Sequence, residues 1–269
     1  MRDRGIAAHR SAWSSRTGCA PTKSNEDTDS MRVNKYISEA GICSRREADE
    51  LLLAGRVTIN GEVVTTGAKA LEGDEVRVDG EIVKARILAA TPSAKRAVYI
   101  ALNKPVGVTC TTDQTVKDNI VDFVDHKERI FPIGRLDKDS EGLILLTSNG
   151  DIVNEILRTE NNHEKEYLVA VNKPVTDEFL KGMARGVRIH GQMTKPCKVR
   201  KIAKFGFAII LTQGLNRQIR LMSAEFGYRV TQLRRVRIIN VKLGHLKPGQ
   251  WRNLTEAELK GLLPNRTQW

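Results

Sequence analysis

The segment that most constrains the fold of this chain is residues 131–151, FPIGRLDKDSEGLILLTSNGD. Residues 143–147 form a continuous apolar run between turn residues, which is typical of a strand that is buried on both faces. Asp137 follows a strand-like approach and precedes a turn, so its carboxylate lies at the end of a rigid element. Two interpretations remain open at this point: a turn aspartate that accepts local backbone hydrogen bonds, or a functional carboxylate that faces a cleft.

Length and charge narrow the class of protein. With 269 residues the chain can form one large domain or two smaller ones, and 40% hydrophobic and 28% charged residues are typical of a globular protein. The formal net charge of +12 favours a polyanionic partner, either nucleic acid or an anionic membrane surface. No apolar run approaches the ~20 residues that span a bilayer, so we expect no membrane-spanning segment.

The cysteines and histidines form no pattern of metal ligands. The chain has 4 cysteines without a C-x-x-C pair and 5 histidines without ligand spacing to them. We therefore expect reduced thiols, a cytoplasmic location and no structural zinc or other metal site. No dimerisation signal is evident, so a monomer is expected.

The chain divides into four segments. Residues 1–30 lack periodicity and are expected to be a disordered leader; we hypothesise that Met31 is the native translation start, which N-terminal sequencing of the native protein would test. Residues 31–83 contain two helix patterns and two hairpin signals, and residues 84–97, KARILAATPSAKRA, are a predicted linker. Residues 98–269 alternate short strands and helices with short connections, which predicts an α+β fold with a mainly antiparallel sheet.

Local signals in residues 31–83 are specific. Residues 33–40 are a predicted helix that ends at Gly41, and the S-x-x-E spacing of Ser44 and Glu47 predicts a capping box for a second helix. Asn60-Gly61 between apolar residues predicts a hairpin, and the theme repeats at residues 79–80. These signals predict a small module of two helices and a sheet.

Basic residues crowd the two predicted helices: Arg32, Lys35, Arg45, Arg46 and Arg56. Arg45 and Arg46 fall in the first turn of the second helix, where the helix dipole disfavours positive charge by about 0.3–1 kcal/mol each. Placement against a local preference favours phosphate binding, although a solvated basic face remains the alternative.

Residues 33–64, VNKYISEAGICSRREADELLLAGRVTINGEVV, resemble an S4 RNA-binding domain in their helix–turn–helix and hairpin. The resemblance implies that the module binds structured RNA by its shape and backbone. The phosphate-binding candidates are then Arg32, Lys35, Arg45 and Arg46.

Three further segments of the larger region place polar residues at the ends of predicted elements. In LNKPVG, Lys104 lies at the tip of a turn; a structural turn is the favoured interpretation and a phosphate contact the second. In KEYLV, Tyr167 opens a strand, where half-buried packing is the usual role. In GLNRQIRLM, Arg217 and Arg220 share one helix face, either as a functional pair or as a solvated one. The core face of this helix is expected to carry Ile219, Met222 and Phe226.

The larger region resembles the bacterial pseudouridine synthases of the RsuA type. Three segments carry this resemblance, and they follow an S4-like module in the right order: GRLDKDSEGLILLTSNGD, the KEY tripeptide and GLNRQIRLM. Within that family, the chain is most similar to the members that act on the large ribosomal subunit, in the segments IALNKPVG, DNIVDFV, FPIGRLDKDS and NHEKEYLV. The resemblance implies an S4 domain in residues 31–83 and, in residues 98–269, a catalytic domain with a mixed, mainly antiparallel sheet flanked by helices. The implied reaction is the isomerisation of a uridine in 23S ribosomal RNA, with a tRNA anticodon uridine as a second candidate, and it requires neither cofactor nor metal.

The resemblance also implies roles for single residues. Asp137 is the implied catalytic carboxylate, and Arg220 is its implied partner in a bidentate contact. Tyr167 would lie against the flipped uracil and is the candidate general base. Arg135 is the candidate that fills the space left by the flipped base, and the remaining RNA-binding candidates are Lys104 and Arg217.

Two other functions are compatible with parts of the sequence. A non-catalytic S4-type RNA-binding or ribosome-assembly factor would have a decayed site, against which Asp137, Tyr167 and Arg220 together argue. Glycoside hydrolysis would need two carboxylates that flank one bond; Asp137 and Asp139 would share a face on a strand but need not do so in a turn. Asp139 and Asp151 are instead expected to be structural. One departure from the family pattern is Leu221, where relatives commonly carry a second arginine.

Overall fold

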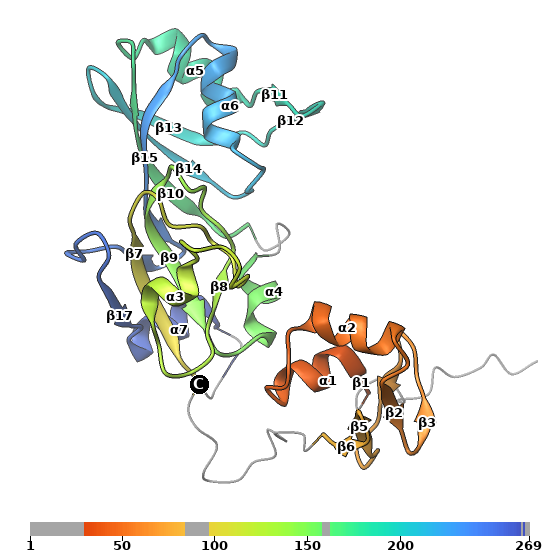
Figure 1. Ribbon diagram of the computed structural model, residues 1–269. Helices are drawn as coiled ribbons and strands as arrows, with labels where there is room; N and C mark the ends of the chain where they lie inside the picture. Colours follow the sequence, from red (N-terminus) through yellow and green to blue (C-terminus); the bar gives the residue numbers. More distant parts are fainter. Residues whose placement is uncertain (1–29, 84–96, 158–161, 265, 267–269) are drawn as a thin grey trace, which may run out of the picture. The chain divides into compact units, whose positions relative to one another are not determined.

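The structure is a computed structural model that describes residues 30–83, 97–157, 162–264 and 266. The chain divides between residues 94 and 95 into two compact units, whose elements are labelled in Figure 1. Apart from Ser30 and Ala97, the predicted leader and linker lie outside the described residues. Within the described ranges, no helix has the length and apolar character needed to cross a membrane.

The first unit joins two helices to small antiparallel sheets. Strand β1 (Met31–Arg32) pairs with β4 (Lys69–Ala70), and β1 leads directly into helix α1 (Val33–Glu39), which α2 (Arg45–Leu53) follows. A second sheet has the order β3–β2–β5–β6, with bounds β2 (Val57–Ile59), β3 (Glu62–Val63), β5 (Val76–Val78) and β6 (Glu81–Ile82). The core between helices and strands includes Val33, Ile37, Ala48, Leu52, Val57 and Val76.

The local signals of this unit are confirmed. The Glu47 N–H donates to Ser44 Oγ at 3.3 Å, and the Ser44 N–H donates to Glu47 Oε2 at 2.6 Å, which completes the capping box of α2. Asn60 and Gly61 have φ of +50° and +88°, the left-handed conformation that a two-residue hairpin of this type requires. Both features depend on residues a few positions apart, which is why the sequence predicts them well.

A 9-stranded sheet is the frame of the second unit (Figure 1). Its order is β13–β14–β10–β15–β9–β7–β17, with β16 paired to β15 and β8 paired to β9. Among the described strands of this sheet only β9 and β15 pair in parallel, so the predicted mixed, mainly antiparallel sheet is confirmed. The bounds are β7 (Tyr99–Lys104), β8 (Phe131–Ile133), β9 (Glu141–Thr147), β10 (Lys165–Val171), β13 (Lys198–Ala203), β14 (Gly206–Leu211), β15 (Val230–Ile238), β16 (Val241–Lys242) and β17 (Trp251–Asn253).

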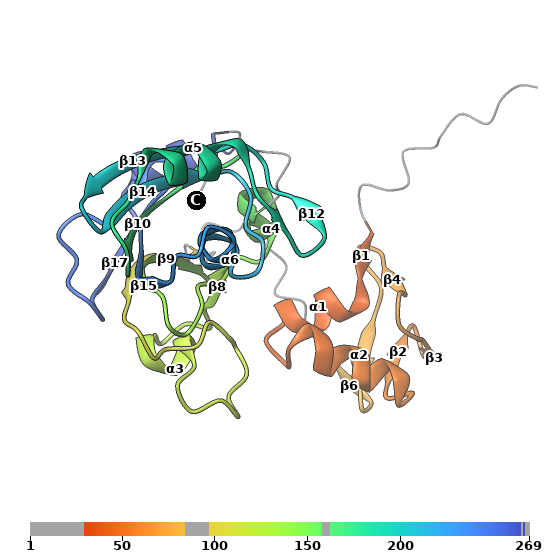
Figure 2. The ribbon, with the colours of Figure 1, turned by 90° about the horizontal axis from the view of Figure 1, so that it is seen from above.

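Helices cover both faces of this sheet, and this explains the unbroken apolar run in β9. Ile144 packs into a core with α3 (Ile120–Val124), α5 (Asp177–Arg185) and α6 (Gln218–Glu225). Its neighbours Leu143 and Leu145 enter a second core with α4 (Asp151–Leu157) and α7 (Glu256–Leu262). A strand with both faces buried has no need for polar alternation. In Figure 2 the strands curve around α6, which positions its first turn near the β8–β9 loop.

The structure corrects the prediction for one core residue and adds elements. Phe226 follows the last residue of α6 and is 38% exposed, with its ring edge-on to Phe179 at 5.8 Å, because the helix ends before it can face the core. The sequence does not predict β13 and β17, which carry mostly exposed side chains at the two edges of the sheet and so lack an apolar pattern. The short hairpin of β11 (Arg188–Ile189) and β12 (Gln192–Met193) is also additional.

Candidate active site

Asp137 lies in the loop between β8 and β9, whose backbone is held by hydrogen bonds on both sides of this residue. The Leu136 N–H donates to Cys110 Sγ at 3.3 Å, and the Ser140 N–H donates to the Asp137 carbonyl at 3.0 Å. Leu136 is buried in the core, whereas the Asp137 side chain is 29% exposed. A fixed backbone therefore presents a partly open carboxylate, as a reactive group requires.

The Asp137 side chain lines a pocket of about 440 Å³. Tyr167 from β10, Arg135 from the same loop and Arg217 from the start of α6 line it as well. The Tyr167 ring is 8% exposed, and the Arg235 guanidinium lies 6.0 Å from its centroid. The fold thus brings predicted site residues from three distant segments around one pocket.

Arg220 contacts the backbone of this loop more closely than it contacts Asp137. Its Nη2 donates to the Asp139 carbonyl at 3.0 Å and to Ser140 Oγ at 3.2 Å, whereas its Nε lies 4.0 Å from Asp137 Oδ2. The Nε is buried without a hydrogen-bond partner among the described residues. The implied pairing of Arg220 with Asp137 is thus present as a long ion pair, and it is not bidentate here because the Nη2 of the guanidinium binds the loop. A shift of about 1 Å would bring the Nε within hydrogen-bond range of the carboxylate.

Asp139 is the carboxylate that both arginines approach most closely. Arg217 Nη1 lies 3.3 Å from Asp139 Oδ1 and 3.9 Å from Asp137 Oδ2. Arg220 Nη2 lies 3.3 Å from Asp139 Oδ2. Asp139 therefore holds two cations beside Asp137. The sequence predicts a structural role for Asp139 but contains no signal for these partners.

Lys104 lies in the interior and not at the tip of a surface turn. Its side chain has 0% exposure, and its ammonium donates to the carbonyls of Val108 at 2.8 Å, Pro105 at 2.9 Å and Lys138 at 3.5 Å. Burial lowers the pKa of Lys104. A side chain without exposed surface cannot reach a phosphate, so the predicted RNA contact of Lys104 is wrong. Its ammonium instead ties residues 105–108 to the loop that carries Asp137.

Lys104→Met is expected to lower the free energy of unfolding by about 1–3 kcal/mol, because buried carbonyls lose their donor. Urea unfolding measures this loss, and RNA affinity should stay unchanged. Lys138→Met is the matched control: its side chain is 58% exposed, so it should lose less than about 0.5 kcal/mol. Weaker RNA binding by Lys104→Met at unchanged stability would contradict the structural role.

The pocket wall also contains two cations that the sequence does not predict as site residues: Lys165 and Arg235. Lys165 lies two residues before Tyr167 on β10, so strand alternation places both on one face, and the KEY tripeptide contains this signal. Arg235 lies on β15 and is 4% exposed. Its burial depends on the order of the strands, so the sequence does not distinguish it from its arginine neighbours.

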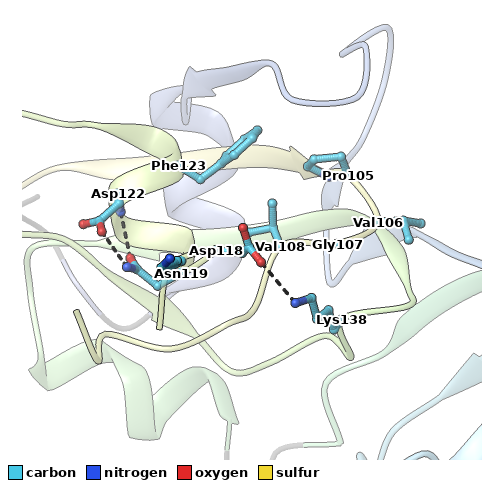
Figure 3. Close-up of a pocket in the computed structure, with 10 residues that line it drawn as sticks. Pro105, Val106, Gly107, Val108, Asp118, Asn119, Asp122, Phe123 and Lys138 are labelled. Carbon is cyan, nitrogen blue, oxygen red and sulfur yellow. Dashed lines mark hydrogen bonds and ion pairs between the residues drawn. The ribbon is translucent and has the colours of Figure 1, made fainter. Parts of the chain in front are cut away.

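A second pocket, of about 560 Å³, includes Lys138 in its wall (Figure 3). Lys138 Nζ pairs with Asp118 Oδ2 at 3.1 Å, and Asn119 caps α3 by accepting from the Asp122 N–H at 2.8 Å. The polar groups drawn there contact one another, and Phe123 adds a partly exposed ring. None of the predicted site residues lines this pocket.

In the first unit, the phosphate-binding candidates lie in or beside the two helices: Arg32, Lys35, Arg45 and Arg46. Lys35 is half-buried, and the other three are exposed. Arg56, which the sequence groups with them, instead makes a bidentate contact with Asp79, from Nε at 2.7 Å and Nη2 at 2.6 Å. This hydrogen bonding lowers the pKa of Asp79. Arg56 is thus engaged within the hairpin region.

Comparisons with known families agree with both units. Residues 31–76 match the S4 domain, and residues 98–225 match the RNA pseudouridylate synthase family. Fold and motifs together define an RNA-modifying isomerase with an S4 module ahead of its synthase domain.

Relatives support the same class. The chain is 58% identical over 230 residues to the dual-specificity RNA pseudouridine synthase RluF of Salmonella typhi, which covers 86% of this chain and 78% of that protein. It is 35% identical over 240 residues to the ribosomal large subunit pseudouridine synthase B of Bacillus subtilis, with 86% and 95% covered. A crystal structure of a pseudouridylate synthase matches with a TM-score of 0.63 and 30% identity, covering 86% of this chain and 99% of that one.

The chain belongs to the RNA pseudouridylate synthase family and is an isomerase that acts on uridine in RNA. The resemblance of its motifs to S4-containing synthases of the RluF kind is thereby confirmed.

Proposed function

We propose that this protein isomerises a specific uridine of 23S ribosomal RNA through the carboxylate of Asp137, with a tRNA anticodon uridine as a second substrate. One observation carries the assignment of Asp137: its partly exposed carboxylate shares a pocket with Tyr167 and has two guanidinium groups 3.9 and 4.0 Å away. The names of the relatives, a dual-specificity synthase and a large-subunit synthase, support the choice of RNA.

The reaction breaks the bond between ribose C1′ and uracil N1, turns the ring and joins C5 to C1′. Asp137 reacts with the sugar or the base, or assists an elimination, and the arginines attract and hold its charge. Tyr167 offers a ring face to the flipped uracil, and its phenol is the candidate general base. Arg220 acts as a positioning residue, because it binds the carbonyl of Asp139 and the hydroxyl of Ser140. Arg135 would fill the space that the flipped base leaves in the RNA.

RNA binding is assigned to both units. Arg32, Lys35, Arg45 and Arg46 are the proposed phosphate contacts of the S4 module, and Arg217 is that of the synthase domain. The proposed boundaries are residues 31–83 for the S4 module, 84–97 for the linker and 98–269 for the synthase domain. The protein is proposed to act as a cytoplasmic monomer.

A pseudouridine map of ribosomal RNA and tRNA, from cells with and without this protein, tests the proposed function. One uridine of 23S ribosomal RNA, and one tRNA anticodon uridine, should lack modification in the deletion and regain it when the chain is supplied again. If every site persists in the deletion, the chain is not the synthase of either RNA, and a non-catalytic RNA-binding factor becomes the better interpretation.

A further inference from the structure

In the described ranges of the chain, three cations of the pocket beside Asp137 form no ion pair with a carboxylate: Arg135, Lys165 and Arg235. Lys165 and Arg235 differ from Arg135 in that they lie on strands of the sheet, β10 and β15. Lys165 Nζ has one long hydrogen bond within the described ranges, to the His163 carbonyl at 3.4 Å. Arg235 Nε donates to the Leu143 carbonyl at 2.6 Å, and its Nη2 is buried without a hydrogen-bond partner among the residues that the structure describes. Both residues line the pocket.

This arrangement differs from that of a neighbouring arginine. Arg237, on the same strand as Arg235, pairs with Glu164 at 3.0 Å and with Glu166 at 3.1 Å. An unpaired charge that is removed from water destabilises the fold. Burial, together with the nearby Arg235, lowers the pKa of Lys165 to about 8. Two uncompensated cations at one pocket therefore indicate that an anion occupies the pocket during function.

The isomerisation itself creates an anion. When the C1′–N1 bond breaks, the electron pair stays on N1, so a neutral base becomes a uracil monoanion with its charge shared by N1, O2 and O4. This holds where Asp137 attacks the sugar or assists an elimination, because the intact ring then leaves the sugar with the bonding pair. Attack on the base would also place negative charge on the ring, first as the enolate of the adduct. When C5 then joins C1′, the bond between C1′ and the Asp137 carboxylate breaks, or, after an elimination, C2′ regains its proton from Asp137. C5 loses one proton and N1 gains one, so the proton balance closes.

We propose that Lys165 is a further catalytic residue, whose ammonium contacts the detached uracil and stabilises its negative charge. Arg235 adds positive potential beside the Tyr167 ring. It lies opposite Tyr167 in the β10–β15 register, and its guanidinium is 6.0 Å from the centroid of that ring. Lys165 and Tyr167 face the same side of β10, so the ring that packs on Tyr167 lies within reach of the ammonium. The contact is stronger for the anion than for neutral uridine, which is the condition for catalysis rather than mere binding.

This inference rests on the proposed function, since it requires that the Asp137 pocket receives the uridine. Lys165→Met removes the charge and keeps most of the stem. With 23S ribosomal RNA from the deletion cells as substrate, its single-turnover rate should fall about 100-fold at unchanged RNA affinity. Lys198→Met is the matched control, because Lys198 is 79% exposed on β13 outside the pocket, and its rate should equal that of the wild type. The melting temperature of Lys165→Met should not fall, since a desolvated charge is removed.

Substrate and pH separate this role from a phosphate contact. Fluorine at C5 stabilises the uracil anion by itself. The rate at which Lys165→Met consumes RNA should therefore fall less with 5-fluorouridine RNA than with uridine RNA.

The wild-type rate should decline as pH rises through about 8, where Lys165 loses its proton. Lys165→Arg should lack this decline because its guanidinium stays charged.

An equal loss on both substrates, a loss of RNA affinity that accounts for the whole effect, or a fully active Lys165→Met would each overturn the inference. Failure of the proposed function looks different. In that case the wild-type protein would not modify the RNA of the deletion cells, or Asp137→Asn would stay active. An active wild type, an inactive Asp137→Asn and a fully active Lys165→Met together would remove only the role of Lys165.

Discussion

Asp137→Asn is expected to lower the single-turnover rate of pseudouridine formation by about 10⁴-fold or more, and to leave RNA binding intact. The amide has nearly the shape of the carboxylate but no charge, so it can neither attack the substrate nor pair with the guanidinium groups 3.9 and 4.0 Å away. The loop should keep its place, because the hydrogen bonds that Arg220 donates to the Asp139 carbonyl and to Ser140 do not involve the Asp137 side chain.

Two measurements check this expectation: the rate with unmodified RNA, and the affinity of the same variant for that RNA. Asp118→Asn is the matched control, since it makes the same chemical change in a carboxylate that is 61% exposed and pairs with Lys138. In cells that lack the wild-type protein, Asp137→Asn should fail to restore modification and Asp118→Asn should restore it. Modification by Asp137→Asn would remove this residue from the catalytic role.

Gly142→Ala is expected to lower the free energy of unfolding of the synthase domain by roughly 3–5 kcal/mol, from backbone strain and steric collision together. Gly142 has φ of +106°, and a Cβ there would collide with the backbone nitrogen and oxygen of Arg235. This is where β9 and β15 pair in parallel, with Gly142 opposite Arg235. Either strand must move, and β9 would carry the Asp137 loop with it. Activity should therefore fall with stability.

Gly107→Ala separates the two contributions. Gly107 has φ of +97°, but a methyl group added there would meet no atom within 4 Å beyond its chain neighbours. Only the backbone conformation is therefore penalised, by about 1–3 kcal/mol. Urea unfolding of both variants, followed in parallel, should show the larger loss for Gly142→Ala. Equal losses in the free energy of unfolding would mean that β9 and β15 can move apart without destabilising the domain, contrary to the close approach of their backbones.

Features that depend on neighbouring residues are predictable from the sequence. The capping box of Ser44 and Glu47 and the Asn60-Gly61 turn form within three or four residues, so no distant contact is needed to specify them. The apolar run of residues 143–147 likewise becomes the buried strand β9, because a continuous apolar run between turn residues is a local signal. Motif order then identifies the family and points to Asp137, Tyr167 and Arg220.

The surroundings of the polar residues are not predictable in this way. The sequence predicts Lys104 at the tip of a turn and leaves a phosphate contact open, yet its ammonium is enclosed by three carbonyls that include one from the Asp137 loop. The family resemblance implies a bidentate contact of Arg220 with Asp137, yet Arg220 lies 4.0 Å from that carboxylate and binds the loop backbone and Asp139 more closely. Each outcome depends on which segments, distant in the chain, become neighbours.

The sequence by itself determined the class of this protein, its order of modules and most of its elements, because helix caps, hairpin turns and apolar periodicity are local properties. Only the tertiary structure decided which charges are buried, which are paired and which stay unpaired, as with Lys165 and Arg235 in the pocket. The physical reason is that burial and pairing depend on strand order, and the parallel contact of β9 with β15 joins residues that are more than 90 positions apart.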